Sequence, residues 1–150
     1  MALINVATRE IHCKVVYYGP GMGGKTSNLQ YIHTQVPKEA KGDLLSIATE
    51  TERTLFFDFL PLDLGTVGPK DRKFQVRFHL YTVPGQVLYE RTRTAVLNGA
   101  DGVVLGFLNG LNRVDLEVMR ELIGEGDVPW TFHRAIDHCL DLDRAWADVK

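Results

Sequence analysis

Apolar and polar positions follow different periods along the chain, and each period predicts one element. A near-continuous apolar run over residues 11–18 predicts a central strand that is buried on both faces. Leu29, Ile32 and Val36 have helical spacing and predict a helix that ends near Val36. Residues 38–53 are polar and show no clear period. The chain therefore begins with a strand, a helix and a long polar segment.

Two further strands are predicted in the middle of the chain. Residues 54–60 predict a strand, as do residues 74–81, which alternate between apolar and polar side chains. Glycine and proline within residues 61–69 predict a long turn, so the two strands should be antiparallel neighbours. Residues 82–86 break the pattern, and residues 87–97 have helical spacing.

The last third of the chain repeats the order of strand and helix. Strands are predicted over residues 101–107 and 128–132, and Asp115 and Asp141 are suited to cap the two helices that follow. The apolar faces of these helices are Leu116, Met119, Leu122 and Ile123 in the first, and Leu142, Ala145, Trp146 and Val149 in the second. The predicted fold class is α/β, as one three-layer domain over residues 1–150 with helices on both faces of the sheet.

A glycine-rich stretch lies between the first strand and the first helix. It reads Gly19-Pro20-Gly21-Met22-Gly23-Gly24-Lys25-Thr26-Ser27 and fits the pattern G-x-x-x-x-G-K-[ST]. Such glycines let backbone N–H groups face a phosphate, Lys25 supplies charge to the outer phosphates, and the Thr26 hydroxyl can ligate Mg²⁺. The N-terminus of the helix adds its positive end. The sequence therefore predicts a phosphate-binding loop, against the alternative of a tight connection only.

Composition and charge limit the other classes. No apolar run approaches the ~20 residues that a membrane span needs, and no secretion signal is recognised, so we expect a cytoplasmic protein without a membrane partner. Cys13 and Cys139 are then expected to be free buried thiols. Residues 1–99 hold 12 Lys and Arg against 9 Asp and Glu, a net charge of +3, and residues 100–150 hold 5 against 10, a net charge of −5. This asymmetry is too small to predict a nucleic-acid partner.

Three stretches of the chain resemble one family of small GTPases. They are Tyr18 to Thr26, Glu52-Arg53-Thr54 before the second long strand, and His79-Leu80-Tyr81-Thr82-Val83-Pro84-Gly85-Gln86. On these motifs, residues 1–99 resemble the MglA family of bacterial Ras-like GTPases, which control cell polarity and gliding motility with the roadblock-type partner MglB. The resemblance implies GTP or GDP as the ligand, Mg²⁺ as the metal, and an MglB-like partner at the switch segments 38–60 and 82–97.

The resemblance also implies roles for individual residues. Gln86 is similar to the glutamine that orients the attacking water, and Gly85 to the glycine whose N–H meets the γ-phosphate. Arg53 resembles an arginine finger supplied in cis, and Thr54 the switch threonine that ligates Mg²⁺. Thr82 stands where most small GTPases have a magnesium-linked aspartate. Apart from the family, Arg53 is equally explained as a solvated surface arginine.

The resemblance to GTPases fails after residue 99. Small GTPases read guanine with Asn-Lys-x-Asp after the strand that corresponds to residues 128–132, and this chain has Phe132-His133-Arg134-Ala135-Ile136-Asp137 there. The similar stretch 112–115 follows the wrong strand, and Asp115 is explained as a helix cap. We therefore expect weakened base selectivity, so that the ligand is a guanine nucleotide or any purine nucleotide.

Residues 100–150 resemble a different family. The motifs are Gly99-Ala100-Asp101-Gly102-Val103-Val104-Leu105-Gly106 and Val128-Pro129-Trp130-Thr131-Phe132-His133-Arg134-Ala135-Ile136-Asp137. They resemble a fragment of two βα units from the CutC family, cytoplasmic TIM-barrel proteins associated with copper homeostasis. We interpret the chain as an engineered chimera joined near residues 99–103. The predicted sheet has five mostly parallel strands in the order 2-3-1-4-5, with one antiparallel edge strand.

A polar cluster follows the last predicted strand. It consists of His133, Arg134, Asp137, His138 and Cys139. Three interpretations remain open: a soft-metal site, a polar loop with Asp137 paired to Arg134, and a contact of His133 and Arg134 with a nucleotide in the phosphate loop. The polar loop is favoured over the metal site because no paired ligand spacing is present.

Two function classes follow from these observations. The first is a Mg²⁺-dependent purine-nucleotide triphosphatase in which Gln86 and Arg53 act at the γ-phosphate. The second is a non-catalytic scaffold that binds phosphate or diphosphate only, or a metal-binding remnant of the CutC-like segment. We favour nucleotide binding without efficient turnover, and we expect self-association through an exposed sheet edge.

Overall fold

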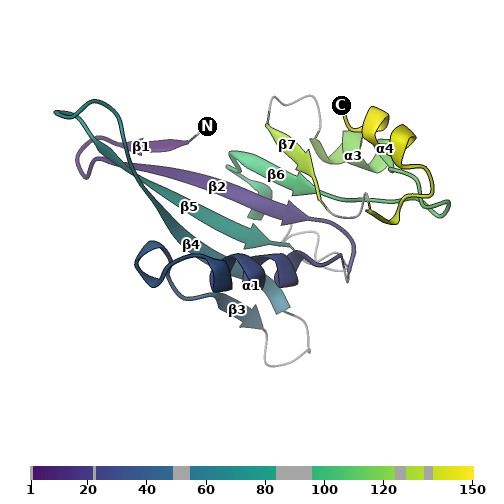
Figure 1. Cartoon of the computed structure of the whole chain (residues 1–150), viewed down its shortest axis with the longest axis horizontal. Helices are drawn as coiled ribbons and strands as arrows, with labels where there is room; N and C mark the ends of the chain where they lie inside the picture. Colours follow the sequence, from purple (N-terminus) through teal and green to yellow (C-terminus); the bar gives the residue numbers. More distant parts are fainter. Residues whose placement is uncertain (1, 22, 49–54, 84–95, 124–127, 134–136) are drawn as a thin grey trace.

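The computed structural model describes the chain except residues 1, 22, 49–54, 84–95, 124–127 and 134–136. The strands are β1 (Leu3–Asn5), β2 (Glu10–Tyr18), β3 (Leu45–Ala48), β4 (Leu55–Val67), β5 (Phe74–Thr82), β6 (Gly102–Leu105) and β7 (Trp130–Phe132). The helices are α1 (Lys25–Gln35), the 3-10 helix η1 (Lys38–Ala40), α3 (Leu116–Ile123) and α4 (Leu142–Asp148). These elements form one mixed α/β sheet with helices packed on it (Figure 1).

The sheet has seven strands in the order β3-β4-β5-β2-β6-β7, and β1 pairs with β2 outside this path. β2 is parallel to β5 and β6, and β6 is parallel to β7. β4 is antiparallel to both of its neighbours. The carboxyl ends of β2, β5, β6 and β7 therefore meet at one edge of the sheet (Figure 1), which is where open parallel sheets bind ligands.

The predicted strand order differs from the observed one by two added strands. The five predicted strands run as β4-β5-β2-β6-β7, but β3 lies outside β4, so the antiparallel strand is not the edge strand. β3 was not predicted because it lies in a polar segment without a period. β1 has three exposed residues and pairs only with the first part of β2, so no apolar alternation marks it in the sequence.

The long turn predicted over residues 61–69 is wrong. β4 continues through it to Val67, and the chain turns only after Gly68. The pairing of β4 with β5 shifts at a bulge between Asp63 and Thr66. This bulge contains Gly65, whose φ of 83° suits glycine. Gly65 therefore marks a bulge inside a strand and not the end of that strand.

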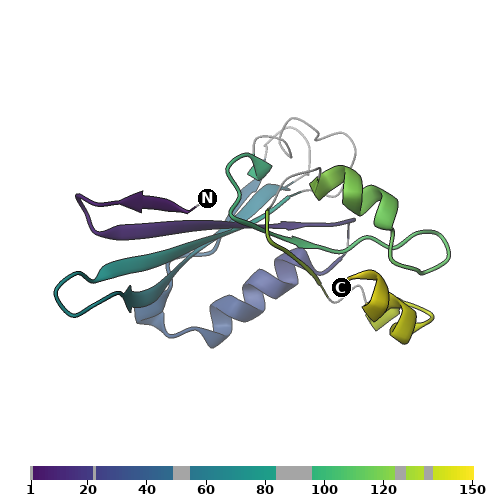
Figure 2. The same ribbon diagram turned by 90° about the horizontal axis from the view of Figure 1, so that it is seen from above.

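Alternate residues of β2 enter two cores on opposite faces of the sheet. Val15 and Tyr17 pack beside Leu29 of α1, while Val16 and Tyr18 belong to the cluster that contains Met119 of α3. Figure 2 shows α1 and α3 on opposite sides of the sheet. The predictions of a strand buried on both faces and of helices on both faces are confirmed.

The helices after β6 confirm their predicted caps. Asp115 accepts a hydrogen bond from the Val118 N–H at 3.2 Å, and Asp141 accepts one from the Arg144 N–H at 3.0 Å. The apolar face predicted for α4 is only partly buried, because Ala145 is buried while Leu142 and Trp146 remain 50% and 54% exposed. Of the helix predicted over residues 87–97, only positions 96 and 97 lie within the described residues, and both are helical.

The sequence also predicted two free buried thiols and no membrane-spanning segment. Cys13 and Cys139 are free, as predicted, but each is half-buried rather than fully buried. Across the ranges that the structure describes, no helix combines the length and the apolar character that a membrane crossing would need.

Replacing Leu29 with Ala should destabilise the fold. The Leu29 side chain of α1 is fully buried in the cluster that contains Leu60 and Leu80, so its loss removes apolar contact and leaves a cavity. We expect the free energy of unfolding in urea to fall by about 2–5 kcal/mol. Leu64→Ala, at a position that is 55% exposed, should change it by less than about 0.5 kcal/mol. Equal effects of the two substitutions would contradict the described core.

A histidine pair joins β2 and β5 and makes stability depend on pH. His12 Nδ1 lies 3.0 Å from His79 Nε2, and the His79 ring stacks on Phe59. Burial lowers the pKa of the His79 imidazole below its usual 6.5, and the charges of His12 and Arg77 act in the same direction. Between the lowered pKa of folded His79 and the ordinary value of 6.5, this imidazole therefore binds more protons in the unfolded chain than in the folded chain.

Stability should consequently fall as the pH is lowered through this range. We expect the urea midpoint of the wild-type chain to drop between pH 7.5 and pH 5.5, and His79→Phe, which keeps a ring on Phe59, to reduce that drop. A pH dependence that is unchanged in His79→Phe would show that His79 does not contribute to it.

Candidate phosphate-binding site

The glycine-rich loop connects the end of β2 to the start of α1. Gly24 precedes the helix with a φ of 74°, a left-handed conformation that favours glycine, and no hydrogen bond from a described side chain caps the helix. The Asn28 N–H already bonds to the Gly24 carbonyl at 2.9 Å, so the helix is formed from its first turn. Its N-terminus is thus placed to receive an anion.

Lys25 lies across this loop. Its Nζ donates to the Gly19 carbonyl at 2.9 Å and to the Pro20 carbonyl at 2.7 Å. Burial lowers the pKa of the Lys25 ammonium, while the nearby Asp58 carboxylate acts in the opposite direction. The only side-chain cation of the loop is thus held inside the loop, where a bound polyphosphate would replace two neutral carbonyl partners with stronger charged ones.

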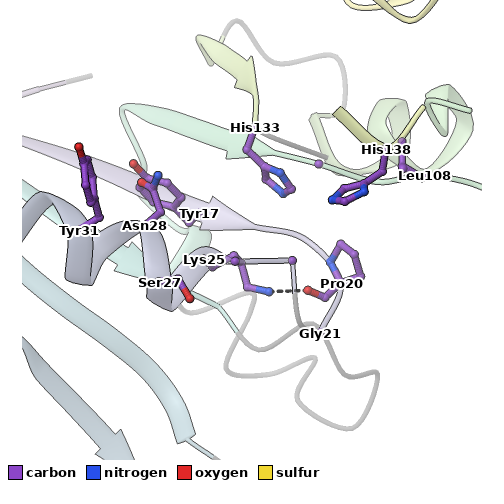
Figure 3. Close-up of a pocket in the computed structure, with 13 residues that line it drawn as sticks. Tyr17, Pro20, Gly21, Lys25, Ser27, Asn28, Tyr31, Leu108, His133 and His138 are labelled. Carbon is purple, nitrogen blue, oxygen red and sulfur yellow. Dashed lines mark hydrogen bonds between the residues drawn. The ribbon is translucent and has the colours of Figure 1, made fainter. Parts of the chain in front are cut away.

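A pocket of about 900 Å³ opens beside the loop (Figure 3). Among the described residues it is lined by Tyr17, Pro20, Gly21, Gly23, Gly24, Lys25, Ser27, Asn28, Tyr31, Gly106, Leu108, His133 and His138. Its size is in the range of small-molecule sites. The structure therefore brings the loop, the exposed side of α1 and the carboxyl ends of β6 and β7 together around one space.

A buried carboxylate lies next to the loop. Asp58 of β4 is 2% exposed and accepts hydrogen bonds from three hydroxyl groups. These come from Thr26 at 2.6 Å, Ser46 at 2.6 Å and Thr82 at 2.9 Å. Thr82 Oγ1 also accepts a hydrogen bond from the Asp58 backbone N–H at 2.8 Å. The last residue of β5 therefore bonds to both the backbone and the carboxylate of Asp58. Both oxygen atoms of the buried carboxylate thus have hydroxyl partners, as buried polar groups generally do.

Asp58 was not identified from the sequence as a site residue. Its signal is a single carboxylate within the otherwise apolar run of residues 54–60, and it was read only as part of the strand. By the sequence resemblance, Thr82 stands where most small GTPases have a magnesium-linked aspartate. The structure brings the Asp58 carboxylate to the Thr82 hydroxyl and to Thr26, so the acidic group at this place comes from a neighbouring strand.

The oxygen atoms around Asp58 suit a hard cation. Mg²⁺ in nucleotide sites takes one or two protein oxygens and completes its shell with water and substrate phosphates. Thr26 and Asp58 supply a hydroxyl and a carboxylate beside the phosphate loop. The donor set present in the chain therefore fits Mg²⁺.

Several predicted site residues cannot be placed. Met22, Arg53, Thr54, Gly85 and Gln86 all lie outside the described residues. The predicted pair of Asp137 with Arg134 cannot be compared with the structure either, because Arg134 lies outside the described residues. Of the predicted loop residues, Gly21, Gly23, Gly24, Lys25 and Ser27 line the pocket, while Gly19 and Thr26 contact Lys25 and Asp58.

The histidines of the C-terminal segment reach this pocket. His133 follows β7, and its backbone N–H donates to the Leu105 carbonyl at 2.7 Å. His133 and His138 both line the pocket beside the phosphate loop. Within the described ranges, no group of three or more His, Cys, Asp or Glu side chains is arranged to hold a metal ion.

Two comparisons divide the chain between two kinds of relatives. Over 104 residues, or 69% of its length, the chain is 61% identical to the mutual gliding-motility protein MglA of Myxococcus xanthus, of which it covers 51%. Residues 76–149 match the model of the CutC family. A CutC family protein of Xylella fastidiosa is 50% identical over 52 residues, covering 34% of the chain and 20% of the relative. One of Bacteroides thetaiotaomicron is 48% identical over 52 residues, covering 21% of that relative.

The resemblances to the MglA and CutC families are thus confirmed. Homology to MglA over most of the chain implies a Ras-like fold, in agreement with the mixed α/β sheet. The chain spans about half the length of the MglA relative and about a fifth of the two CutC relatives. The MglA match and the CutC match overlap within the chain, because the first takes 69% of it and the second begins at residue 76.

Replacing Thr82 with Val should remove two hydrogen bonds to Asp58 and destabilise the fold. The substitution keeps the shape of the side chain but removes the acceptor of the buried Asp58 N–H and one donor to its carboxylate. We expect a loss of about 1–3 kcal/mol in the free energy of unfolding. Thr34→Val, at an exposed position of α1, should stay within about 0.5 kcal/mol of the wild type. A Thr82→Val chain as stable as the wild type would contradict the network.

Proposed function

We propose that this chain binds a nucleoside di- or triphosphate through Gly19, Gly21, Met22, Gly23, Gly24, Lys25, Thr26 and Ser27. The observation that carries the proposal is the half-buried Lys25 ammonium, which lies inside a glycine-rich loop at the N-terminus of α1 and beside a pocket of about 900 Å³. Backbone N–H groups, a helix N-terminus and a lysine are together the parts of a phosphate site. Homology to MglA, a gliding-motility protein, supports the same class.

Mg²⁺ is proposed as the metal of this site. Thr26 and Asp58 would hold it through a hydroxyl and a carboxylate, and Thr54 is the further candidate from the first switch segment. The ion would neutralise the charge of the outer phosphates. Asp58 would thereby supply the acidic group that Thr82 lacks.

Hydrolysis is a separate proposal that depends on Gln86, Gly85 and Arg53. Their roles rest on the resemblance alone. Gln86 would orient the attacking water, Gly85 would contact the γ-phosphate, and Arg53 would act as an arginine finger. The guanine motif of small GTPases is replaced by residues 132–137, so we propose nucleotide binding with turnover well below that of a small GTPase. Phosphate release from GTP, compared between wild type and Gln86→Ala, separates an enzyme from a binding module.

Partners and origin are proposed on the same basis. An MglB-like roadblock protein is the proposed partner of segments 38–60 and 82–97. Matches to two different families within one chain support a chimera built as one α/β domain over residues 1–150. Its proposed junction near residues 99–103 rests on the sequence motifs. Trp130 of the edge strand β7 is 37% exposed, which supports self-association at this edge.

Replacing Lys25 with Ala should weaken nucleotide binding. The loss of a charged donor to phosphate is worth about 1.5–3 kcal/mol, which is about a tenfold to a 150-fold rise in Kd. We expect this change for GDP in the presence of Mg²⁺, measured by isothermal titration calorimetry. Lys70→Ala removes the same charge from the exposed turn between β4 and β5 and should leave the Kd unchanged. Equal affinities of the three proteins would refute the phosphate site.

A further inference from the structure

The pocket extends beyond the phosphate loop. Phosphates held by Gly21, Gly23, Gly24 and Lys25 would use only the loop, while the pocket also extends along other walls. These walls come from α1 and from the residues after β6 and β7. A ligand larger than a diphosphate is needed to fill a space of this size.

Three glycines leave room for the His133 ring to lie against the phosphate loop. A Cβ atom added at Gly106 would lie 1.9–2.3 Å from three atoms of the His133 ring, and one added at Gly19 would lie 2.8 Å from Nε2. The ring also approaches Gly23, where an added Cβ would be 3.8 Å from Cε1. The imidazole therefore lies directly on the backbone of Gly106, which follows β6, and of the phosphate loop. Any side chain at position 106 would displace the His133 ring.

The His133 ring is suited to be a neutral aromatic wall. Burial lowers the pKa of its imidazole, and the charge of Lys25 acts in the same direction. The described groups that face it across the pocket are Lys25, Tyr17, Tyr31 and His138, and none of them is acidic. In Figure 3, His133 and His138 approach the pocket from the same side, opposite Lys25.

We propose that His133 and His138 form the base-side wall of a nucleoside di- or triphosphate site that does not distinguish guanine from adenine. The proposal rests on the phosphate-loop function above and adds the contact that replaces the guanine motif. Imidazole rings present flat faces to any base, and stacking on aromatic side chains tolerates every base. Guanine selectivity would require an acceptor pair for its N1–H and N2–H₂ groups, and no carboxylate is among the described residues that line the pocket.

The test is a competition against fluorescent GDP in Mg²⁺ with three unlabelled ligands: GDP, ADP and inorganic pyrophosphate. We expect GDP and ADP to agree within about threefold, and both to bind at least about tenfold tighter than pyrophosphate, since stacking of one base is worth ~1–3 kcal/mol. His138→Ala should weaken GDP and ADP by about fivefold to tenfold and leave pyrophosphate unchanged. His33→Ala, a histidine of α1 that does not line the pocket, should change none of the three.

A second variant tests the placement of His133 without removing it. Gly106→Ala would push the ring off the loop, because the added Cβ would occupy its position. We expect the same selective loss for GDP and ADP in a chain whose urea transition shows that it is still folded.

Three results would overturn the proposal. GDP that binds more than tenfold tighter than ADP would show a selective base site. GDP and ADP that bind no tighter than pyrophosphate would show that only the phosphates are held, and the phosphate-loop function would stand without a base wall. Failure of pyrophosphate and both nucleotides to bind would refute the phosphate-loop function itself, and the base wall with it.

Discussion

The parallel pairing of β2 with β6 is the contact on which the site depends. It aligns Val15 with Gly102 and Tyr18 with Leu105, so the strand that carries the phosphate loop is bonded to the first strand after residue 99. The Lys14 N–H donates to Asp101 Oδ2 and the Asp101 N–H to the Lys14 carbonyl, both at 2.7 Å, where the pairing begins. A slip of this register would move Gly106 and His133 away from the loop.

The second contribution to the site comes from the other side of β2. Asp58 reaches Thr26 because β4 is antiparallel to β5 and places this carboxylate beside Thr82 at the carboxyl end of β5. The proposed Mg²⁺ site thus takes its carboxylate from β4 and lies beside the Thr82 hydroxyl at the end of β5. The phosphate loop lies between these two contributions, with the Asp58 carboxylate on one side and the imidazoles of His133 and His138 on the other.

Local patterns in the sequence predicted much of the fold because they report burial and capping directly. The double-sided burial of β2 and the caps Asp115 and Asp141 were read correctly. β1 was missed because it is short and its three residues are exposed, and β3 because it is short and lies in a polar segment without a period. The glycine of the bulge at Gly65 was misread as part of a turn. Asp58 was missed because its importance depends on which strand lies next to it, which periodicity does not encode. The contact of His133 with Gly106 is likewise a tertiary one, although the sequence did bring His133 forward as a nucleotide contact.

Hydrogen–deuterium exchange with and without GDP and Mg²⁺ is the most direct test of a single site built from both segments. The account predicts that backbone amides of the phosphate loop and the start of α1, residues 19–28, become protected together with those of residues 102–108 at the end of β6. Protection confined to residues 19–28, or no change in either segment, would contradict it.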